Sequence, residues 1–420
     1  MHSTDALPLP PRPDIAQYRK LAKELAAAVK SREAAAIQAW ARRWFGELYR
    51  LSGEERSEHH RLNHEVREEP IDPQIERDAQ RFTAYWTGER KVKDIPPPKP
   101  TLAHVQFIIA RMHGFTNWAS LVHHIDTLWR EDSSVARFET AVDAIVSGDD
   151  VALGILLKKH PELVRQRSSR DHGCTLLHYV SANGVEGYRQ RTPLNIVEIT
   201  KPLLAAGSDV NATAKSYGGG DTVLGLTATS MHPHNAGVII PMLETLVAAG
   251  ADIHHKDGGW TLVRACLANG QPEAARWLAA HGAEVDLSGA AGMGMLDVVR
   301  TFVARDGTLI NGATRKQLED AWESATWYGE VEVARYLMDA GIDTALARED
   351  GATALHRAAY AGEPEMVELL LARGAPRDVK DKTHGTTPLV WATHAWRVEG
   401  KNDAAAYARI VAALGGDAQA

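Results

Sequence analysis

The sequence has only two cysteines in 420 residues, Cys174 and Cys266, which are too few for a disulfide framework. It contains no run of about 18 apolar residues, so we expect no membrane-spanning helix. Its first residues lack a basic segment followed by an apolar stretch, which argues against a secretory signal. These absences together predict a protein of a reducing cytoplasm.

An excess of basic residues is also missing. The 47 Lys and Arg residues are outnumbered by 54 Asp and Glu residues, which gives a formal net charge of −7. Nucleic-acid-binding proteins are typically basic, so we expect no nucleic-acid partner. Apolar residues make up 44% of the chain and charged residues 24%, as in ordinary globular proteins. A chain of this length predicts two or three domains or one elongated array.

The first third of the chain predicts a small helical module. Residues 1–13 are rich in proline, and we expect them to form a disordered leader. Residues 14–132 carry apolar residues at helical spacing, which predicts helices that include 102–112 and 118–129. The prolines of residues 95–100 exclude a helix interior and predict a stiff linker inside this module.

Residues 133–420 repeat one pattern. Residues 350–362 read DGATALHRAAYAG and are followed by an apolar stripe. The distance of 21 residues between Thr353 and Gly374 recurs at Thr261–Gly282 and at Asp320–Gly341. Less regular copies bring the number of units to about eight, so this part of the chain is predicted to be an array of similar structural units.

The pattern resembles the ankyrin repeat, in which a β-turn and a T-P-L-H-x-A segment precede two antiparallel helices. The resemblance implies an all-α fold, an ankyrin-repeat solenoid preceded by the helical N-terminal module. Because no repeat covers its own apolar face, each must stack on its neighbours. We therefore expect the module to cap the array, with Leu121 and Ile125 buried near Phe138 and Val142.

The whole chain is also similar to a widespread group of bacterial ankyrin proteins. Residues 109–121, which read IARMHGFTNWASL, match the end of the helical module in that group. Residues 183–186 and 229–233 are similar to insertions in its repeats. The group has no assigned reaction, so this resemblance implies an architecture and no particular chemistry.

Three units depart from the regular spacing through insertions between their two helices. The unit beginning at Thr175 has 11 additional residues, and the next unit, beginning at Thr222, has 7. A further insertion of 7 residues follows Thr387. Since adjacent repeats hold the first two insertions side by side, we expect these to form one polar patch.

This patch is a candidate pocket. Tyr188 and Arg189 offer an aromatic face and a cationic fork, which suit a small anionic ligand such as a carboxylate or phosphate. His232 and His234 with Glu186 are of the right types for a metal ion or a general base, but their spacing matches no metal motif. Alternatively, these side chains only shape the loops. We predict no cofactor and assign no metal ligand. His178 also occupies the standard histidine position of the repeat. The complete set of candidate pocket residues is His178, Glu186, Tyr188, Arg189, Tyr217, Asp221, His232 and His234.

The concave face of the array is a second candidate site. The seventh residue after the threonine position of the repeat is Trp327, Tyr360 and His394 in three successive units. Equivalent positions of stacked helices lie about 10 Å apart, so we expect a ladder of rings, with Tyr328 and Trp391 nearby. Aromatic side chains are enriched at interface hot spots. Alternatively, the rings pack between repeats as part of the core.

Two functions follow from these candidate sites. The favoured one is a protein-interaction scaffold that binds a protein or peptide partner on the concave face. The alternative is an enzyme or small-molecule binder at the first two insertions, for which we identify no catalytic residue. Convergence of Tyr188, Arg189 and His232 around one cavity would favour the alternative, because groups far apart cannot contact one small ligand.

Overall fold

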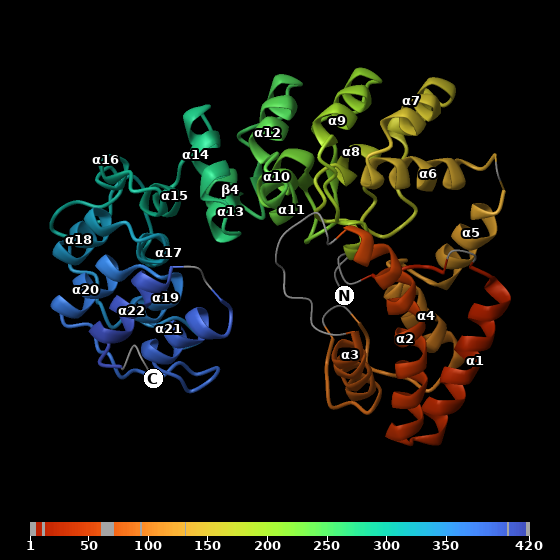
Figure 1. Ribbon diagram of the computed structural model, residues 1–420, viewed down its shortest axis with the longest axis horizontal. Helices are drawn as coiled ribbons and strands as arrows, with labels where there is room; N and C mark the ends of the chain where they lie inside the picture. The colour runs from red at the N-terminus through yellow and green to blue at the C-terminus, as the bar shows by residue number, and fades with distance from the viewer. Residues whose placement is uncertain are drawn as a thin grey trace. The chain divides into compact units, whose positions relative to one another are not determined.

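The computed structural model describes residues 6–10, 13–59, 71–92, 95–130, 132–400 and 403–416. The chain divides into two compact units, Met1–Gly259 and Trp260–Ala420. Helices dominate both units, and each strand is only two residues long (Figure 1). The division falls inside the repeat array, so the N-terminal module belongs to the same unit as the first repeats.

Five helices form the N-terminal module. They are α1 (Ile15–Ser31), α2 (Ala34–His59), α3 (Ile71–Trp86), α4 (Leu102–Met112) and α5 (Trp118–Leu128). The last two confirm the helices predicted over 102–112 and 118–129 to within one residue. Tyr18, Trp44 and Phe115 are buried in the core that these helices share.

The described part of the Pro-rich leader packs on this module. The N–H of Leu7 donates to the carbonyl of Met112 at 2.8 Å, and the Leu7 carbonyl lies 3.0 Å from Nδ1 of His113. Ala6 and Leu7 are both buried. The prediction of disorder is therefore wrong for residues 6–10, because these apolar side chains have a partner surface that composition does not reveal; residues 1–5, 11 and 12 lie outside the described residues.

Three helix pairs follow in the first unit. They are α6 (Ser134–Ser147) with α7 (Asp150–Lys159), α8 (Leu176–Tyr179) with α9 (Ile196–Ala205), and α10 (Val223–Ala228) with α12 (Ile239–Ala248). The 3-10 helices η2 (Pro161–Arg165) and η3 (Gly187–Arg189), the short helix α11 (Met231–Asn235) and the strands β1 (Thr213–Ala214), β2 (Asp221–Thr222) and β3 (Lys256–Asp257) connect them. The helix η3 belongs to the first insertion and α11 to the second.

Five more pairs form the second unit, after strand β4 (Trp260–Thr261). They are α13 (Leu262–Ala268) with α14 (Pro272–Ala280), α15 (Leu287–Gly292) with α16 (Leu296–Val299), α17 (Arg315–Trp327) with α18 (Val331–Asp339), α19 (Ala354–Ala361) with α20 (Pro364–Ala372), and α21 (Pro388–Arg397) with α22 (Ala404–Ala413). The first helices of successive pairs stack on one another, α15 on α17, α17 on α19 and α19 on α21 (Figure 1). The described residues thus contain the eight units that the spacing predicts, arranged as an all-α ankyrin solenoid.

The threonine of the repeat caps the first helix of its pair. In α19, the N–H of Thr353 donates to Nδ1 of His356 at 3.1 Å, and the Thr353 hydroxyl lies 2.9 Å from the same atom. Thr175 and His178 make the same contacts at the start of α8. This reciprocal cap satisfies amide groups that a helix start leaves free, which explains why Thr and His recur three residues apart.

Helix α17 begins earlier than the repeat spacing predicts. The spacing places Asp320 at the threonine position, yet α17 starts at Arg315. Its cap is Thr314, whose hydroxyl accepts the N–H of Gln317 at 3.3 Å, while the Gln317 side chain accepts the N–H of Thr314 at 2.8 Å. The additional helical turn carries Lys316 and other charged side chains. They lie beside residues 346–353, the β-turn segment that precedes α19; we call such a segment before the first helix of a pair a finger.

The module contacts the first repeats through the finger at residues 166–175. The N–H of Asp171 donates to the carbonyl of Gly114 at 2.8 Å, and its carboxylate accepts a hydrogen bond from Thr116 at 3.0 Å. Leu121 and Ile125 are fully buried in the core of the module, and their helix, α5, also contacts α6 of the first repeat; a direct contact with Phe138 and Val142 stays a prediction. The finger and the module therefore form one packed region within the first unit.

We predict that Leu121→Ala lowers the free energy of unfolding by about 3 kcal/mol, because it removes buried apolar surface and leaves a cavity. Chemical denaturation of the full chain measures this change. Leu194→Ala is the matched control, since Leu194 is 74% exposed, and it should change stability by less than about 0.5 kcal/mol. Equal effects of the two substitutions would show that α5 is not part of the cooperative core.

Candidate functional site

Three aromatic rings form a continuous ladder on the first helices of the last three pairs. Trp327 lies at the end of α17, Tyr360 near the end of α19 and Trp391 in the first half of α21. The ring centroids are 5.8 Å apart between Trp327 and Tyr360 and 5.9 Å apart between Tyr360 and Trp391. All three side chains are half-buried, so one part of each ring packs in the array and another part faces solvent.

Hydrogen bonds hold two of these rings in place. The Tyr360 hydroxyl donates to the Glu399 carboxylate at 2.7 Å, and the Trp391 indole lies 3.2 Å from Oδ2 of Asp381. Burial, together with the contact to Glu399, raises the pKa of Tyr360 to about 12, so the phenol keeps its proton at neutral pH. Because these side chains are already ordered, a partner that contacts them loses little additional side-chain entropy.

His394 and Tyr328 do not extend the ladder. Nε2 of His394 lies 3.4 Å from a Glu399 oxygen, and its side chain is 53% exposed. The Tyr328 hydroxyl donates to the carbonyl of Leu267, which is a contact between repeats. The ladder continues through Trp391, four residues after the threonine position, because the finger before α21 holds that indole.

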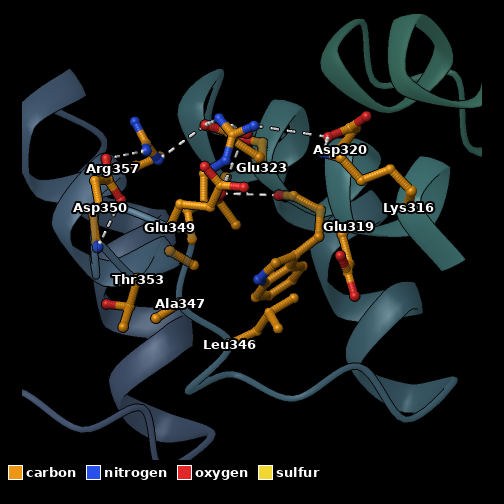
Figure 2. Close-up of a pocket in the computed structure, with 15 residues that line it drawn as sticks. Lys316, Glu319, Asp320, Glu323, Leu346, Ala347, Glu349, Asp350, Thr353 and Arg357 are labelled. Carbon is orange, nitrogen blue, oxygen red and sulfur yellow. Dashed lines mark hydrogen bonds and ion pairs between the residues drawn. The ribbon is translucent and has the colours of Figure 1, made fainter.

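A cavity of about 550 Å³ with charged and apolar walls lies beside the ladder, between α17 and the finger that precedes α19 (Figure 2). Its lining comes from three segments: Lys316, Glu319, Asp320, Trp322, Glu323 and Thr326 of α17; Leu346, Ala347, Arg348, Glu349, Asp350, Ala352 and Thr353 of the finger; and Ala354 and Arg357 of α19. The repeat spacing, which places Asp320 at the threonine position, does not predict this cavity. The Thr314 and Gln317 pair, three residues apart, is the capping-box signal that could have revealed the longer helix.

Ion pairs link the charged side chains of the cavity wall. Arg357 Nε lies 3.0 Å from the Glu323 carboxylate, and Arg357 Nη2 lies 3.1 Å from Asp350. Arg348 pairs with the same Glu323 carboxylate. These pairs join α17, the finger and α19, and they give the cavity a fixed charged wall.

In the first unit, three of the candidate pocket residues take part in a different structure, a buried ion network. Arg170, in the finger before α8, pairs with Glu139 of α6 at 2.8 Å and with Glu186 of the insertion at 2.7 Å. Arg189 pairs with the other Glu139 oxygen at 2.6 Å. The hydroxyl of Tyr188 accepts a hydrogen bond from Arg170 at 3.3 Å. The first insertion thus folds back on the preceding repeat.

The electrostatics of this network follow from its burial and its pairing. Burial alone would raise the pKa of Glu139, but Arg170 and Arg189 outweigh this effect and lower it to about 2. The same balance, with Arg170 as the main opposing charge, holds the pKa of Glu186 well below its usual range. Both carboxylates are ionised at neutral pH and neutralise the arginines, so Arg189 is not available to an anionic ligand from solvent.

The five other candidate pocket residues lie outside these ion pairs. His178 is the buried cap of α8, and burial lowers its pKa to about 4. Oδ2 of Asp221 accepts the N–H groups of Ser216 and Tyr217, at 2.9 and 3.2 Å, and shapes the finger. The exposed Tyr217 donates to Asn183 at 2.6 Å.

His232 and His234 lie on α11 of the following repeat. His232 is exposed and His234 half-buried. The contacts that join the two insertion-bearing repeats include those of Asn183, which donates to Thr229 at 3.2 Å and to the Leu226 carbonyl at 3.0 Å, and among the described residues no hydrogen bond between these repeats uses the side chain of either histidine. Within the described residues, no group of three or more His, Cys, Asp or Glu side chains has an arrangement that could hold a metal ion. The contacts thus bring Glu186, Tyr188 and Arg189 together without the two histidines.

Two segments of the chain match known repeat families. Residues 323–407 match the family described as ankyrin repeats (3 copies), and residues 240–279 match ankyrin repeats (many copies). The chain is an ankyrin-repeat protein. Ankyrin repeats are generally protein-interaction modules, which supports an interaction role for this chain.

Protein PhlB of Serratia liquefaciens is 34% identical over 122 residues, which make up 29% of this chain and 48% of PhlB. The chain therefore spans about half the length of that curated relative. The crystal structure of the ankyrin repeat domain of Bcl-3, a unique member of the IkappaB protein family, is 18% identical, with a TM-score of 0.28 over 66% of this chain and 98% of that chain. The stacked helix pairs and the matches to the two repeat families identify the fold of this chain.

Among the described helices, none combines the length and the apolar character that crossing a membrane requires. A bacterial origin and a cytoplasmic location remain predictions from the sequence.

We predict that Glu139→Gln lowers the free energy of unfolding by about 3 kcal/mol at pH 7, because it leaves two buried arginines without their shared carboxylate. Asp143→Asn is the matched control on the same helix: Asp143 also pairs with Arg189, at 2.9 Å, but its side chain is 66% exposed. This control should cost less than about 1 kcal/mol. Denaturation midpoints of the full chain measure both, and similar losses would contradict a buried network.

The same carboxylate predicts a pH dependence. Its lowered pKa means that Glu139 contributes stability above about pH 4.5 and loses this contribution as the pH falls towards 2. The stability difference between the wild type and Glu139→Gln should therefore shrink between about pH 5 and pH 2, roughly the interval between the two pKa values. A difference that stays constant over that interval would mean that the pKa of Glu139 is not lowered.

Proposed function

We propose that this ankyrin-repeat protein is an interaction scaffold that binds a peptide segment of a protein partner. The binding face is formed by the fingers and by the first helices of the pairs in the second unit. The single observation that carries this proposal is the half-exposed ladder of Trp327, Tyr360 and Trp391. Stacked repeats present such extended surfaces to their partners.

The chemistry of the ladder supports a peptide as the ligand. Aromatic rings bury a large apolar area, and they are enriched among the residues that dominate binding energy. The neighbouring groups Glu399 and His394 are exposed and polar. An apolar centre with a polar rim is the usual composition of a protein-binding surface.

An enzyme or small-molecule site at the first two insertions has weaker support. Glu186 and Arg189, its most suitable charged groups, are buried and already paired with groups of the protein. Their arrangement fits a structural connection between repeats, and no observation specifically favours catalysis there.

We predict that Trp327→Ala and Tyr360→Ala each weaken peptide binding about 30-fold, which corresponds to roughly 2 kcal/mol for a hot-spot side chain. Peptides are first selected with the full chain from a random 12-residue library displayed on phage. The affinities of the synthesised peptides are then measured by isothermal titration calorimetry.

Trp277→Ala is the matched control, because Trp277 is a half-buried indole on α14, a second helix of its pair, stacked on His281 at 3.8 Å. It should leave the affinity unchanged. Thermal melts of all three variants check that each remains folded. The proposal fails if Trp327→Ala and Tyr360→Ala bind the peptides as tightly as the wild type does.

A further inference from the structure

The cavity beside the ladder is lined by both apolar and acidic side chains. Its wall includes the indole of Trp322, which is 3% exposed, and the half-buried Leu346. Glu319 and Glu349 stand on opposite sides, one on α17 and the other on the finger, with Leu346 below them in the view (Figure 2). The cavity thus combines apolar surface with carboxylates.

The free charge of this cavity is negative. Its three basic side chains all have carboxylate partners: Arg348 pairs with Glu323, Arg357 with Glu323 and Asp350, and Lys316 with Asp320. In the described part of the chain, Glu349 forms no ion pair, and Glu319 pairs only with Arg315, which is 58% exposed and lies outside the lining. A cationic group could therefore bind here without displacing an existing buried partner.

The second unit as a whole has the same sign of charge. Residues 260–420 carry 22 Asp and Glu residues and 16 Lys and Arg residues, a formal charge of −6, while residues 1–259 carry −1. Such a field raises the association rate of a cationic ligand and decreases in strength as salt is added.

A donor without an acceptor lies in the cavity wall. Among the described residues, no group accepts a hydrogen bond from Nε1 of Trp322, although the atom is buried. Buried N–H donors are nearly always paired, so this indole is an exception. The indoles of Trp40, Trp44 and Trp86 are others among the described residues. Because Nε1 of Trp322 is buried, a group bound in the cavity contacts the ring of Trp322 and not its N–H.

The cavity and the ladder form one surface. Trp327 follows Glu323 of the cavity wall by four residues on α17, and Tyr360 follows Arg357 by three residues on α19. Residues three or four apart share one face of a helix. A peptide lying across the ladder would therefore reach the cavity with a neighbouring side chain.

We infer that this cavity binds a lysine or arginine side chain of the partner peptide. The aliphatic stem of that side chain packs on Leu346 and Trp322, and its cationic end lies between Glu319 and Glu349. This inference rests on the proposed function, since it names the chemistry of the peptide that the ladder binds.

The test uses the peptides selected with the full chain from the phage-displayed library. We expect Lys or Arg at one shared position, and replacing that residue by Gln should weaken binding about 10-fold at low salt. Glu319→Gln combined with Glu349→Gln should weaken the basic peptide by a similar factor and leave its Gln analogue unaffected. The control pair Glu332→Gln and Glu365→Gln removes the same charge from exposed sites on α18 and α20, and it should change neither affinity.

The possible results separate this inference from the proposed function. If the peptides depend on Trp327 and Tyr360 but show no basic preference, or if the cavity variant binds both peptides as the wild type does, the inference is overturned and the proposed function remains. If the basic peptide depends on Glu319 and Glu349 but not on the ladder, the cavity is supported and the proposed ladder site is overturned. A selection that yields no binding peptide overturns both.

Discussion

The stacking of one small-residue helix face on the next is the constraint on which the rest of this protein depends. A single helix pair has an apolar face that it cannot cover, and Ala358 with Ala359, both fully buried, allows α19 to approach its neighbours closely. Because every repeat solves the same packing problem in the same way, equivalent residues recur at fixed spacing along one face. The ring ladder is a direct consequence, since Trp327 and Tyr360 occupy the same position in successive repeats.

The first unit shows what happens when a repeat departs from this regular packing. Gly184 adopts a positive φ of 71°, and a Cβ at this position would lie 2.6 Å from the Ser216 hydroxyl, so only glycine allows the chain to enter the insertion here. The insertion then carries Glu186 and Arg189 into the buried network around Glu139. Buried charges are tolerated only when they are paired, and each of these two side chains forms an ion pair with a residue of another segment. The insertion therefore connects the repeats and the finger that contacts the N-terminal module.

The second unit uses charge differently. Its ion pairs at Arg348 and Arg357 lie at the wall of a cavity, and among the described residues Glu349 in that wall has no basic partner. Helix α17 begins before its repeat boundary, at Arg315, and Lys316 of its first turn lines the cavity beside the next finger. The cap at Thr314, in place of one at Asp320, thus adds Lys316 and Glu319 to the wall of this cavity.

The sequence by itself determined the fold, because stacked repeats require Thr, Ala, Leu and Gly at the same positions of each repeat, and this period is visible in the sequence. It also determined that Trp327 and Tyr360 share one face, since this follows from the same period. It did not determine which ring continues the ladder: Trp391 rather than His394 does so, because Asp381 in the preceding finger holds its indole. Nor did it determine that Arg189 is buried against Glu139, 50 residues away, or that the leader packs through Leu7. Only the tertiary structure decided these features. The sequence shows that a side chain is charged or apolar, but it does not show whether that side chain contacts solvent or a distant segment of the same chain.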